Sequence, residues 1–168
     1  TLVATATTGI TLDTTIVALD ATNNSSGAVT IREANSIDIN HLRITNTTVN
    51  NHSITTTNGS ITVVAAATGL GIQIDAGGGP TTFLLLDANG AAADIAVNHE
   101  VRSNAFPGPV GNLDITMRAD RNATFGTAAN VQDVAATKMN AAVDKFSAWV
   151  ANLPASIQVV VPVSEVNA

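Results

Sequence analysis

The feature that most constrains the fold is a succession of short β-type runs along the first three quarters of the chain. Clusters of Asn, Gly, Ser and Asp separate the runs, and these residues favour turns because they accept positive φ or bond their own backbone. Helical periodicity is absent before about residue 130. The chain is therefore predicted to be all-β, with runs at 10–12, 16–19, 28–31, 37–39, 42–44, 60–65, 71–75, 83–87, 94–97 and 113–118.

The pair Asn58-Gly59 allows two interpretations. Asn-Gly is the strongest short-range signal for a two-residue hairpin turn, which would pair 60–65 antiparallel with 53–57. A corner of a repeating coil would instead pair 60–65 in parallel with a segment about 20 residues away. We favour the corner because similar text recurs downstream. Either way, alternation puts Ile54, Ile61 and Val63 on one face and Thr55, Thr57 and Thr62 on the other.

The spacing of the runs also supports two architectures. Several runs start about 11 residues apart, which suits an antiparallel β-sandwich with a C-terminal helix. The text is also similar at about 20 to 22 residues, where GIQIDAGGG, ADIAVNHEV and LDITMRADRN can be superimposed. A fixed period with similar text is typical of a β-solenoid, a parallel β-helix-like fold in which each strand stacks on the same strand of the next coil. We predict the solenoid and keep the sandwich as the alternative.

Three blocks carry a resemblance to a known family. They are TTTNGSITVVAAATG (55–69), FLLLDANGAAADIAVN (83–98) and GNLDITMRADRNATFGTAANV (111–131). These blocks resemble the repeats of filamentous-haemagglutinin-like and related giant bacterial surface exoproteins. The resemblance covers roughly 26–130, while NAFPGPVG (104–111) and the first forty residues depart from it. It implies a β-solenoid fold and a structural or adhesive role at the cell surface.

Composition narrows the function. Hydrophobic residues make up 45% of the 168 residues, charged residues 12% and aromatic residues 3%, so the core should be aliphatic. The net charge is −6 and the seven Lys and Arg are scattered, which argues against nucleic acid because phosphate binding needs a basic stripe. No apolar run approaches the roughly 20 residues of a membrane span. Cysteine is absent, which excludes disulfides and Cys-ligated zinc.

The abundant Thr and Asn, the few Lys and the lack of Cys favour an extracellular or cell-surface location. No signal peptide is visible, so either a leader has been removed or the chain is a piece of a longer one.

The C-terminal segment differs from the rest. Residues 1–130 are predicted to form a β-repeat body, and residues 131–168 a helix plus an edge strand. Apolar residues recur at three and four from Val131 to Val150, as in an amphipathic helix. Pro154 would end the helix, and 157–166 would follow as an edge strand because Pro162 cannot donate to a ladder. This segment would either cap the body or contact another subunit.

No residue is predicted to be catalytic, cofactor-binding or metal-binding. His41, His52 and His99 lack partners at ligand spacing, and Asp114 and Asp120 cannot be placed in one cleft from sequence. Oxygen-rich turns near Asp75, Asp87, Asn89 and Asp94 could supply ligands for Ca²⁺, although no complete calcium-loop motif exists. The Gly77-Gly78-Gly79-Pro80 stretch lacks the Lys of a phosphate loop. The threonines (5, 7, 45 and 47) are predicted to be structural. The glycosylation sequons (Asn23, Asn24, Asn46, Asn51, Asn58 and Asn122) are expected by chance in a chain rich in Asn and Thr, and matter only if the host glycosylates them.

The sequence thus predicts a structural or adhesive extracellular protein without catalysis. It would be a building block of a surface layer, filament or adhesin. Its expected partners are further copies of itself or further repeats of a longer chain, and surface glycans. The alternative is a carbohydrate-binding or polysaccharide-cleaving β-module, for which the lack of Tyr and the single Trp are unfavourable.

Overall fold

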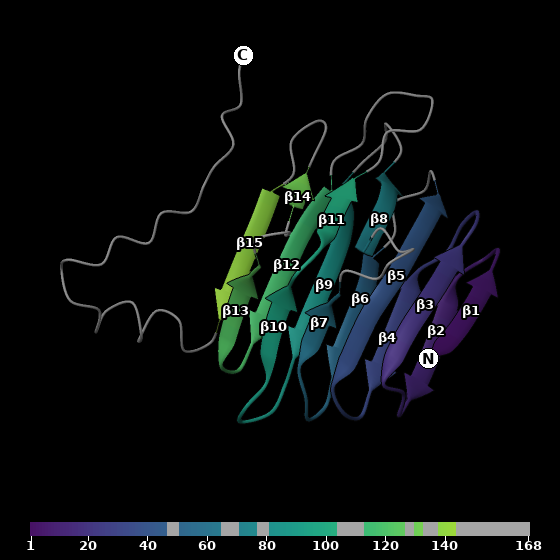
Figure 1. Ribbon diagram of the computed structural model, residues 1–168. Coiled ribbons are helices and arrows are strands. Elements are labelled where there is room, and N and C mark those ends of the chain that lie inside the picture. The colour runs from purple at the N-terminus through teal and green to yellow at the C-terminus, as the bar shows by residue number, and fades with distance from the viewer. Residues whose placement is uncertain are drawn as a thin grey trace, which may run out of the picture.

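The chain folds into two β-sheets in which every described strand pair is parallel (Figure 1). The computed structural model describes residues 1–46, 51–64, 71–76, 81–103, 113–126, 130–132 and 138–143. These ranges contain strands and no helix. The all-β prediction is therefore confirmed, and the antiparallel sandwich is wrong for the described strands.

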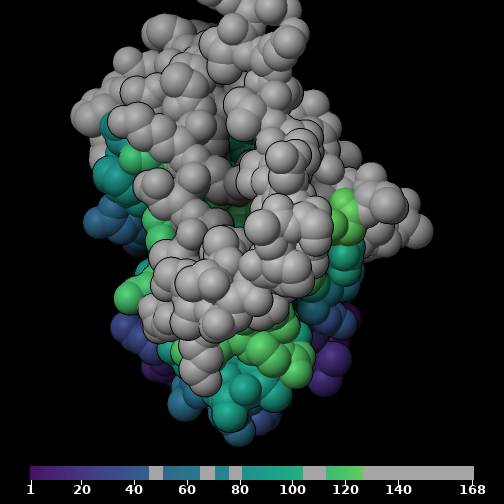
Figure 2. All heavy atoms as spheres, turned by 90° about the vertical axis from the view of Figure 1, so that its left-hand side faces the viewer, coloured from purple at the N-terminus to yellow at the C-terminus, as the bar shows by residue number. Residues whose placement is uncertain are grey.

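The chain passes repeatedly between the two sheets. The nine-stranded sheet contains β1 (Leu2–Ala6), β3 (Ala18–Asn23), β5 (Ile37–Asn46), β7 (Ile61–Val63), β8 (Gly71–Ala76), β10 (Asp94–Val97), β11 (Glu100–Ser103), β13 (Asn122–Phe125) and β14 (Asn130–Gln132). The six-stranded sheet contains β2 (Ile10–Thr14), β4 (Val29–Glu33), β6 (Asn51–Thr56), β9 (Thr82–Ala88), β12 (Leu113–Ala119) and β15 (Lys138–Val143). The strands are stacked in chain order, so that residues 113–125, green in Figure 2, are near one end of the stack.

The two sheets share one aliphatic core. Alternate residues of each strand point inward, and parallel register aligns them into columns. On the six-stranded sheet Ile31 aligns with Ile54, Ile54 with Leu86, and Leu86 with Met117, all fully buried. Burial of each such side chain contributes about 2 to 3 kcal/mol. Narrow columns of Ile, Leu and Val explain why the chain needs so few aromatic residues.

The repeat differs from the predicted step of about 20 to 22 residues. Ile10 pairs with Val29 and Leu19 with Ile39, steps of 19 and 20, but Ile61 pairs with Ile95, a step of 34. The step lengthens because the long strand β5 pairs with two shorter strands of the same sheet. β7 pairs with its first half and β8 with its second half. The predicted superposition of β8, β10 and β12 is wrong, since these strands are not paired with one another. The spacing of about 11 residues instead separates strands that follow one another in the chain, such as β7, β8, β9 and β10.

The Asn58-Gly59 pair is a corner between sheets. β6 belongs to the six-stranded sheet, whereas β7 belongs to the nine-stranded sheet and pairs in parallel with β5 and β10. The predicted parallel pairing of this strand is confirmed, with partners 24 and 34 residues away rather than about 20, and the hairpin is wrong. Gly59 lies against the preceding corner so closely that a Cβ there would be 2.2 Å from the Ser36 backbone nitrogen. The glycine is needed for corner stacking, and none of the positive φ angles required by an Asn-Gly hairpin turn is recorded at Gly59.

The predicted C-terminal helix is not supported, because Asn130–Gln132 and Lys138–Val143 are strands within its span. The register places Met139, Ala141 and Val143 beside Ile115, Met117 and Ala119. The same residues therefore also fit the two-residue alternation of a strand. The backbone groups of β12 on the side away from β9 supply hydrogen-bond partners for β15, and these outweigh local helical propensity. The predicted strand at 157–166 and the rest of the C-terminal segment lie outside the described residues.

Candidate functional site

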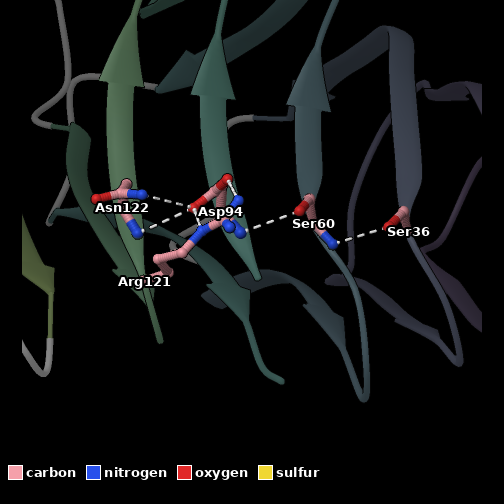
Figure 3. A network of polar contacts seen from close by, with 5 residues as sticks. All are labelled: Ser36, Ser60, Asp94, Arg121 and Asn122. Atoms are coloured by element: carbon pink, nitrogen blue, oxygen red, sulfur yellow. Dashed lines mark hydrogen bonds and ion pairs between the residues drawn. The ribbon is translucent and has the colours of Figure 1, made fainter. Parts of the chain in front are cut away.

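A row of polar side chains runs along one corner of the fold, at the start of four strands of the nine-stranded sheet (Figure 3). We call Ser36, Ser60, Asp94 and Asn122 the corner row. The backbone N–H of Ser60 donates to Ser36 Oγ at 3.0 Å, and that of Asp94 donates to Ser60 Oγ at 3.0 Å. Asn122 continues the series, its N–H donating to Asp94 Oδ1 at 3.1 Å. The side chains of Ser36, Ser60 and Asp94 each accept a backbone N–H of the next turn, which is a structural role.

Arg121 completes the corner row at Asp94. Its Nε donates to Asp94 Oδ1 at 2.8 Å, and its Nη2 contacts Asp94 Oδ2 in a two-point pair. The hydrogen bond from Arg121 is the main cause that lowers the pKa of Asp94, while the same bond raises the pKa of Arg121. Both groups therefore stay charged near neutral pH, and their hydrogen-bonding capacity is used within the corner.

A second polar row crosses the outer face of β5, β8 and β11. We call Arg43, Gln73 and Arg102, which share one register position, the outer row. Their sequence neighbours, such as Ile72 and Ile74, point into the core, so the row faces outward. Arg43 donates from Nη1 to Gln73 Oε1 at 2.7 Å and from Nη2 to Asp75 Oδ2 at 2.8 Å. Arg102 Nη1 lies 3.3 Å from a Glu100 carboxylate oxygen.

The outer row holds donors that the described protein groups do not use. Gln73 is 1% exposed, and its Nε2 has no hydrogen-bond partner. Arg102 Nε is likewise buried and unpartnered. A buried donor without a partner is rare and costly, which distinguishes these two groups from the other polar groups of the sheet. This row is the strongest candidate for a functional site in the described part of the chain.

The structure places the three histidines in separate surroundings. His41 Nδ1 lies 3.2 Å from Asp20 Oδ1 on the outer face of β5 and β3, and His99 Nδ1 accepts the Glu100 N–H at 2.6 Å. His52 is buried in the core, where its Nδ1 accepts the Val29 N–H at 3.1 Å. Burial lowers the pKa of His52 to about 4, so the ring is neutral at physiological pH.

The possible calcium ligands are not gathered into one site. Asp75 pairs with Arg43, Asp94 pairs with Arg121, and the side-chain amide of Asn89 donates to the Thr56 carbonyl. Asp87 lies within β9, in register with Arg118. No group of three or more His, Cys, Asp or Glu that could hold a metal occurs among the residues described.

The two carboxylates considered as a hydrolytic pair lie at opposite ends of β12. Asp114 is the second residue of the strand, and Asp120 directly follows it. Six residues of extended strand separate them by about 20 Å, too far for a shared cleft. Asp120 Oδ2 accepts the Gly90 N–H at 2.7 Å, which is a corner contact.

Of the other residues considered from the sequence, Thr45 and Asn23 make hydrogen bonds that support the fold. Thr45 donates its hydroxyl to the Asn23 carbonyl, and Asn23 itself is fully buried. The Asn23 side chain accepts the Gly9 N–H and donates to the carbonyls of Ser26 and Gly27, so it holds a turn. Thr5 and Thr7 are exposed, as are Asn24, Asn51, Asn58 and Asn122. Thr47 and the stretch 77–80 lie outside the described residues, as does the side chain of Asn46.

Sequence reasoning missed a buried acid, Glu33, at the end of β4. Its Oε2 accepts from the Thr14 hydroxyl and the Ile16 N–H, and its Oε1 accepts the Asn35 N–H at 3.1 Å. An open hollow of about 420 Å³ lies beside it, lined by Asp13, Thr14, Thr15, Arg32, Glu33, Ala34 and Thr57. Because three donors already hold the carboxylate, Glu33 serves the fold. The only signal in the sequence was a charged residue at an inward position of the alternation.

No protein-family model matches the chain, and no curated protein or solved structure is significantly similar to it. A search of the described residues finds no helix with the length and apolar character needed to cross a membrane.

Proposed function

We propose that the described strands are successive coils of a β-solenoid, and that the protein is a structural or adhesive component of an extracellular surface. It would be a building block of a surface layer, filament or adhesin and would have no catalytic activity. The observation that carries the proposal is the unbroken series of parallel, in-register pairings, from β2 through β4, β6, β9 and β12 to β15. Each turn of chain covers the core of the one before it.

The exterior of the coils supports a contact role. Outward positions of the strands carry many Thr, Ser and Asn side chains, whereas the inward positions are aliphatic. Such a surface offers neutral hydroxyl and amide groups along its length. It suits repeated weak contacts with glycans or with other copies better than it suits the binding of one charged partner.

The first strands offer an assembly surface. β1 pairs only with β3 and β2 only with β4 among the described strands, so each has a row of backbone groups on its other side. Val3 of β1 is 72% exposed. A further parallel strand of matching pattern, from another copy or from another repeat of a longer chain, would extend both ladders and cover Leu2 and Leu12.

Two measurements test this proposal. Negative-stain electron microscopy of the purified protein should show fibres or sheets, and antibody labelling of intact cells should reach the protein without permeabilisation. A monodisperse particle at every concentration, together with labelling only after permeabilisation, would contradict the structural role at a surface.

A further inference from the structure

Two corners of the chain carry an Asn-Gly pair, Asn58-Gly59 and Asn89-Gly90. In such a pair the backbone nitrogen of the glycine can attack the side-chain carbonyl carbon of the asparagine, because glycine has no Cβ that obstructs the approach. A carbon–nitrogen bond forms, the side-chain nitrogen leaves as ammonia with the glycine proton, and the cyclic imide takes up water to give aspartate or isoaspartate. The reaction therefore requires a released glycine N–H and an asparagine side chain that can turn over the backbone.

Both reacting groups are held at the Asn89-Gly90 corner. The side-chain Nδ2 of Asn89 donates to the Thr56 carbonyl at 2.9 Å, and the Gly90 N–H donates to Asp120 Oδ2 at 2.7 Å. The Asp120 carboxylate also disfavours the negative charge that the Gly90 nitrogen carries during the attack, because like charges repel. This pair is closed to the reaction while the two corners stay stacked.

Only the glycine nitrogen is held at the Asn58-Gly59 corner. The Gly59 N–H donates to the Asn89 carbonyl at 2.9 Å, an acceptor without a net charge. Asn58 is exposed, and its side-chain amide makes no hydrogen bond within the described part of the chain. Its Oδ1 lies beside Gly90, 2.7 Å from where a Cβ of that residue would be. The Asn58 side chain can therefore turn as soon as the Gly59 N–H is released.

We infer that Asn58 is the residue at which the folded chain deamidates, and that corner stacking protects Asn89. Opening of the hydrogen bond from Gly59 gates the reaction, so Asn58 reacts more slowly in the folded chain than in the unfolded chain. Isoaspartate lengthens the backbone at the place where Gly59 lies against Ser36, so the modified corner stacks less closely. This chemistry needs only the chain and water and does not depend on the proposed function.

The direct test is peptide mapping by mass spectrometry, with fragmentation that distinguishes asparagine, aspartate and isoaspartate. The full chain is incubated at mildly alkaline pH, both folded in buffer and unfolded in concentrated urea. In urea Asn58 and Asn89 should react at similar rates, because each precedes a glycine and neither is held. In the folded chain Asn58 should react at least about tenfold faster than Asn89, the factor that one further hydrogen bond gives.

Variants separate the hydrogen bonds from the local sequence. Asp120→Ala removes the acceptor of the Gly90 N–H and should speed the deamidation of Asn89 in the folded chain about tenfold. The rate at Asn58 should change much less, because the hydrogen bond between the two corners is kept. The matched control Asp114→Ala removes a carboxylate near the other end of β12 and should leave both rates unchanged. Urea denaturation checks that both variants remain folded.

Three results would overturn the inference. One is that Asn89 deamidates in the folded chain as fast as Asn58. Another is that neither residue reacts in the folded chain while both react in urea, which would mean that the Asn58 corner is closed as well. The last is that a folded Asp120→Ala variant leaves the rate at Asn89 unchanged. If that variant does not fold, the comparison of the two asparagines in the original chain decides alone.

Discussion

The corner row and the outer row use similar residues on the same sheet, yet their hydrogen bonds are arranged differently. In the corner row Ser36, Ser60 and Asp94 each accept a backbone N–H from the next turn, and Asp94 also pairs with Arg121. In the outer row, Gln73 Nε2 and Arg102 Nε remain without partners among the described groups. Closed hydrogen bonding indicates a structural row, whereas the outer row leaves two buried donors unused by the described groups.

The largest effect is expected where corners stack on backbone. Gly59→Ala would place a Cβ 2.2 Å from the Ser36 nitrogen and 2.5 Å from the Asn35 carbonyl carbon, so the two stacked corners must move apart. We expect a loss of about 4 kcal/mol in the free energy of unfolding, measured by urea denaturation.

The matched control for that prediction is Gly126→Ala. Its Cβ would meet the Asn98 side-chain oxygen at 2.6 Å, and that side chain can rotate away. The loss should be about 1 kcal/mol. Equal losses for the two variants would contradict the close stacking of the Gly59 corner.

Glu33→Ala tests how much a fully buried carboxylate contributes to the stability of the fold. Glu33 is fully buried, and its removal leaves the Thr14 hydroxyl and the N–H groups of Ile16 and Asn35 without acceptors. The expected loss is about 3 kcal/mol, measured by urea denaturation. Asp13→Ala, at an exposed ion pair with Arg32, should change stability by less than about 0.5 kcal/mol. A loss for Glu33→Ala no larger than for Asp13→Ala would contradict the assigned role.

His52 predicts a pH dependence of stability. Its folded pKa of about 4 lies below the ordinary value of 6.5, because burial disfavours the charged ring. The unfolded chain therefore binds a proton first as the pH falls, and stability that is present above pH 6.5 is lost between 6.5 and about 4. The loss should be on the order of 2 to 3 kcal/mol, followed by urea denaturation across that range.

The control for the pH effect is His52→Leu, which extends the aliphatic column that contains Leu84. This variant loses an acceptor for the Val29 N–H and so starts less stable, but its stability should be flatter between pH 6.5 and 4. An unchanged slope would show that other groups cause the acid sensitivity.

The smallest effect is expected in the outer row, and it separates the two rows most sharply. Asp94→Ala removes the carboxylate that accepts hydrogen bonds from the Asn122 N–H, from the Asn122 side-chain amide and from Arg121. The free energy of unfolding should fall by about 1.5 kcal/mol. Gln73→Met removes one bond from Arg43 but also an unpaired buried amide, so stability should change by less than about 0.5 kcal/mol. Thermal or urea unfolding compares the two, and an equal loss would make the outer row merely structural.

Local patterns predicted the strands and the faces, but not the length of the turn. Ile54, Ile61 and Val63 are buried as expected, because alternation is a local property of a strand. The number of residues between paired strands was missed because both β7 and β8 pair with β5, and pairing between distant segments determines this. The strand at Leu2–Ala6 was not among the predicted runs because Thr and Ala dilute its apolar alternation.

The candidate site was not predictable from the sequence. Gln73 and Arg102 are 29 residues apart, and only the pairing of β8 with β11 brings them together. The helix expected over 131–150 failed for a related reason, since the edge of β12 stabilises β15 as a strand. Sequence periodicity describes each segment alone, whereas a stacked sheet also imposes the conformation of its neighbour.

The central claim, that successive turns stack in parallel through corners such as Asn58-Gly59, is tested most directly by disulfide trapping in this cysteine-free chain. The register pairs Thr62 with Asp38 on one side and with Ala96 on the other. Thr62→Cys combined with either Asp38→Cys or Ala96→Cys should oxidise readily to an intramolecular disulfide, because paired strands bring the Cα atoms within bonding range. Thr62→Cys with Thr55→Cys, the pair that a hairpin at Asn58-Gly59 would place opposite each other, should remain reduced. Preferential trapping of the 55–62 pair would contradict the parallel pairing of the strands and both polar rows that depend on it.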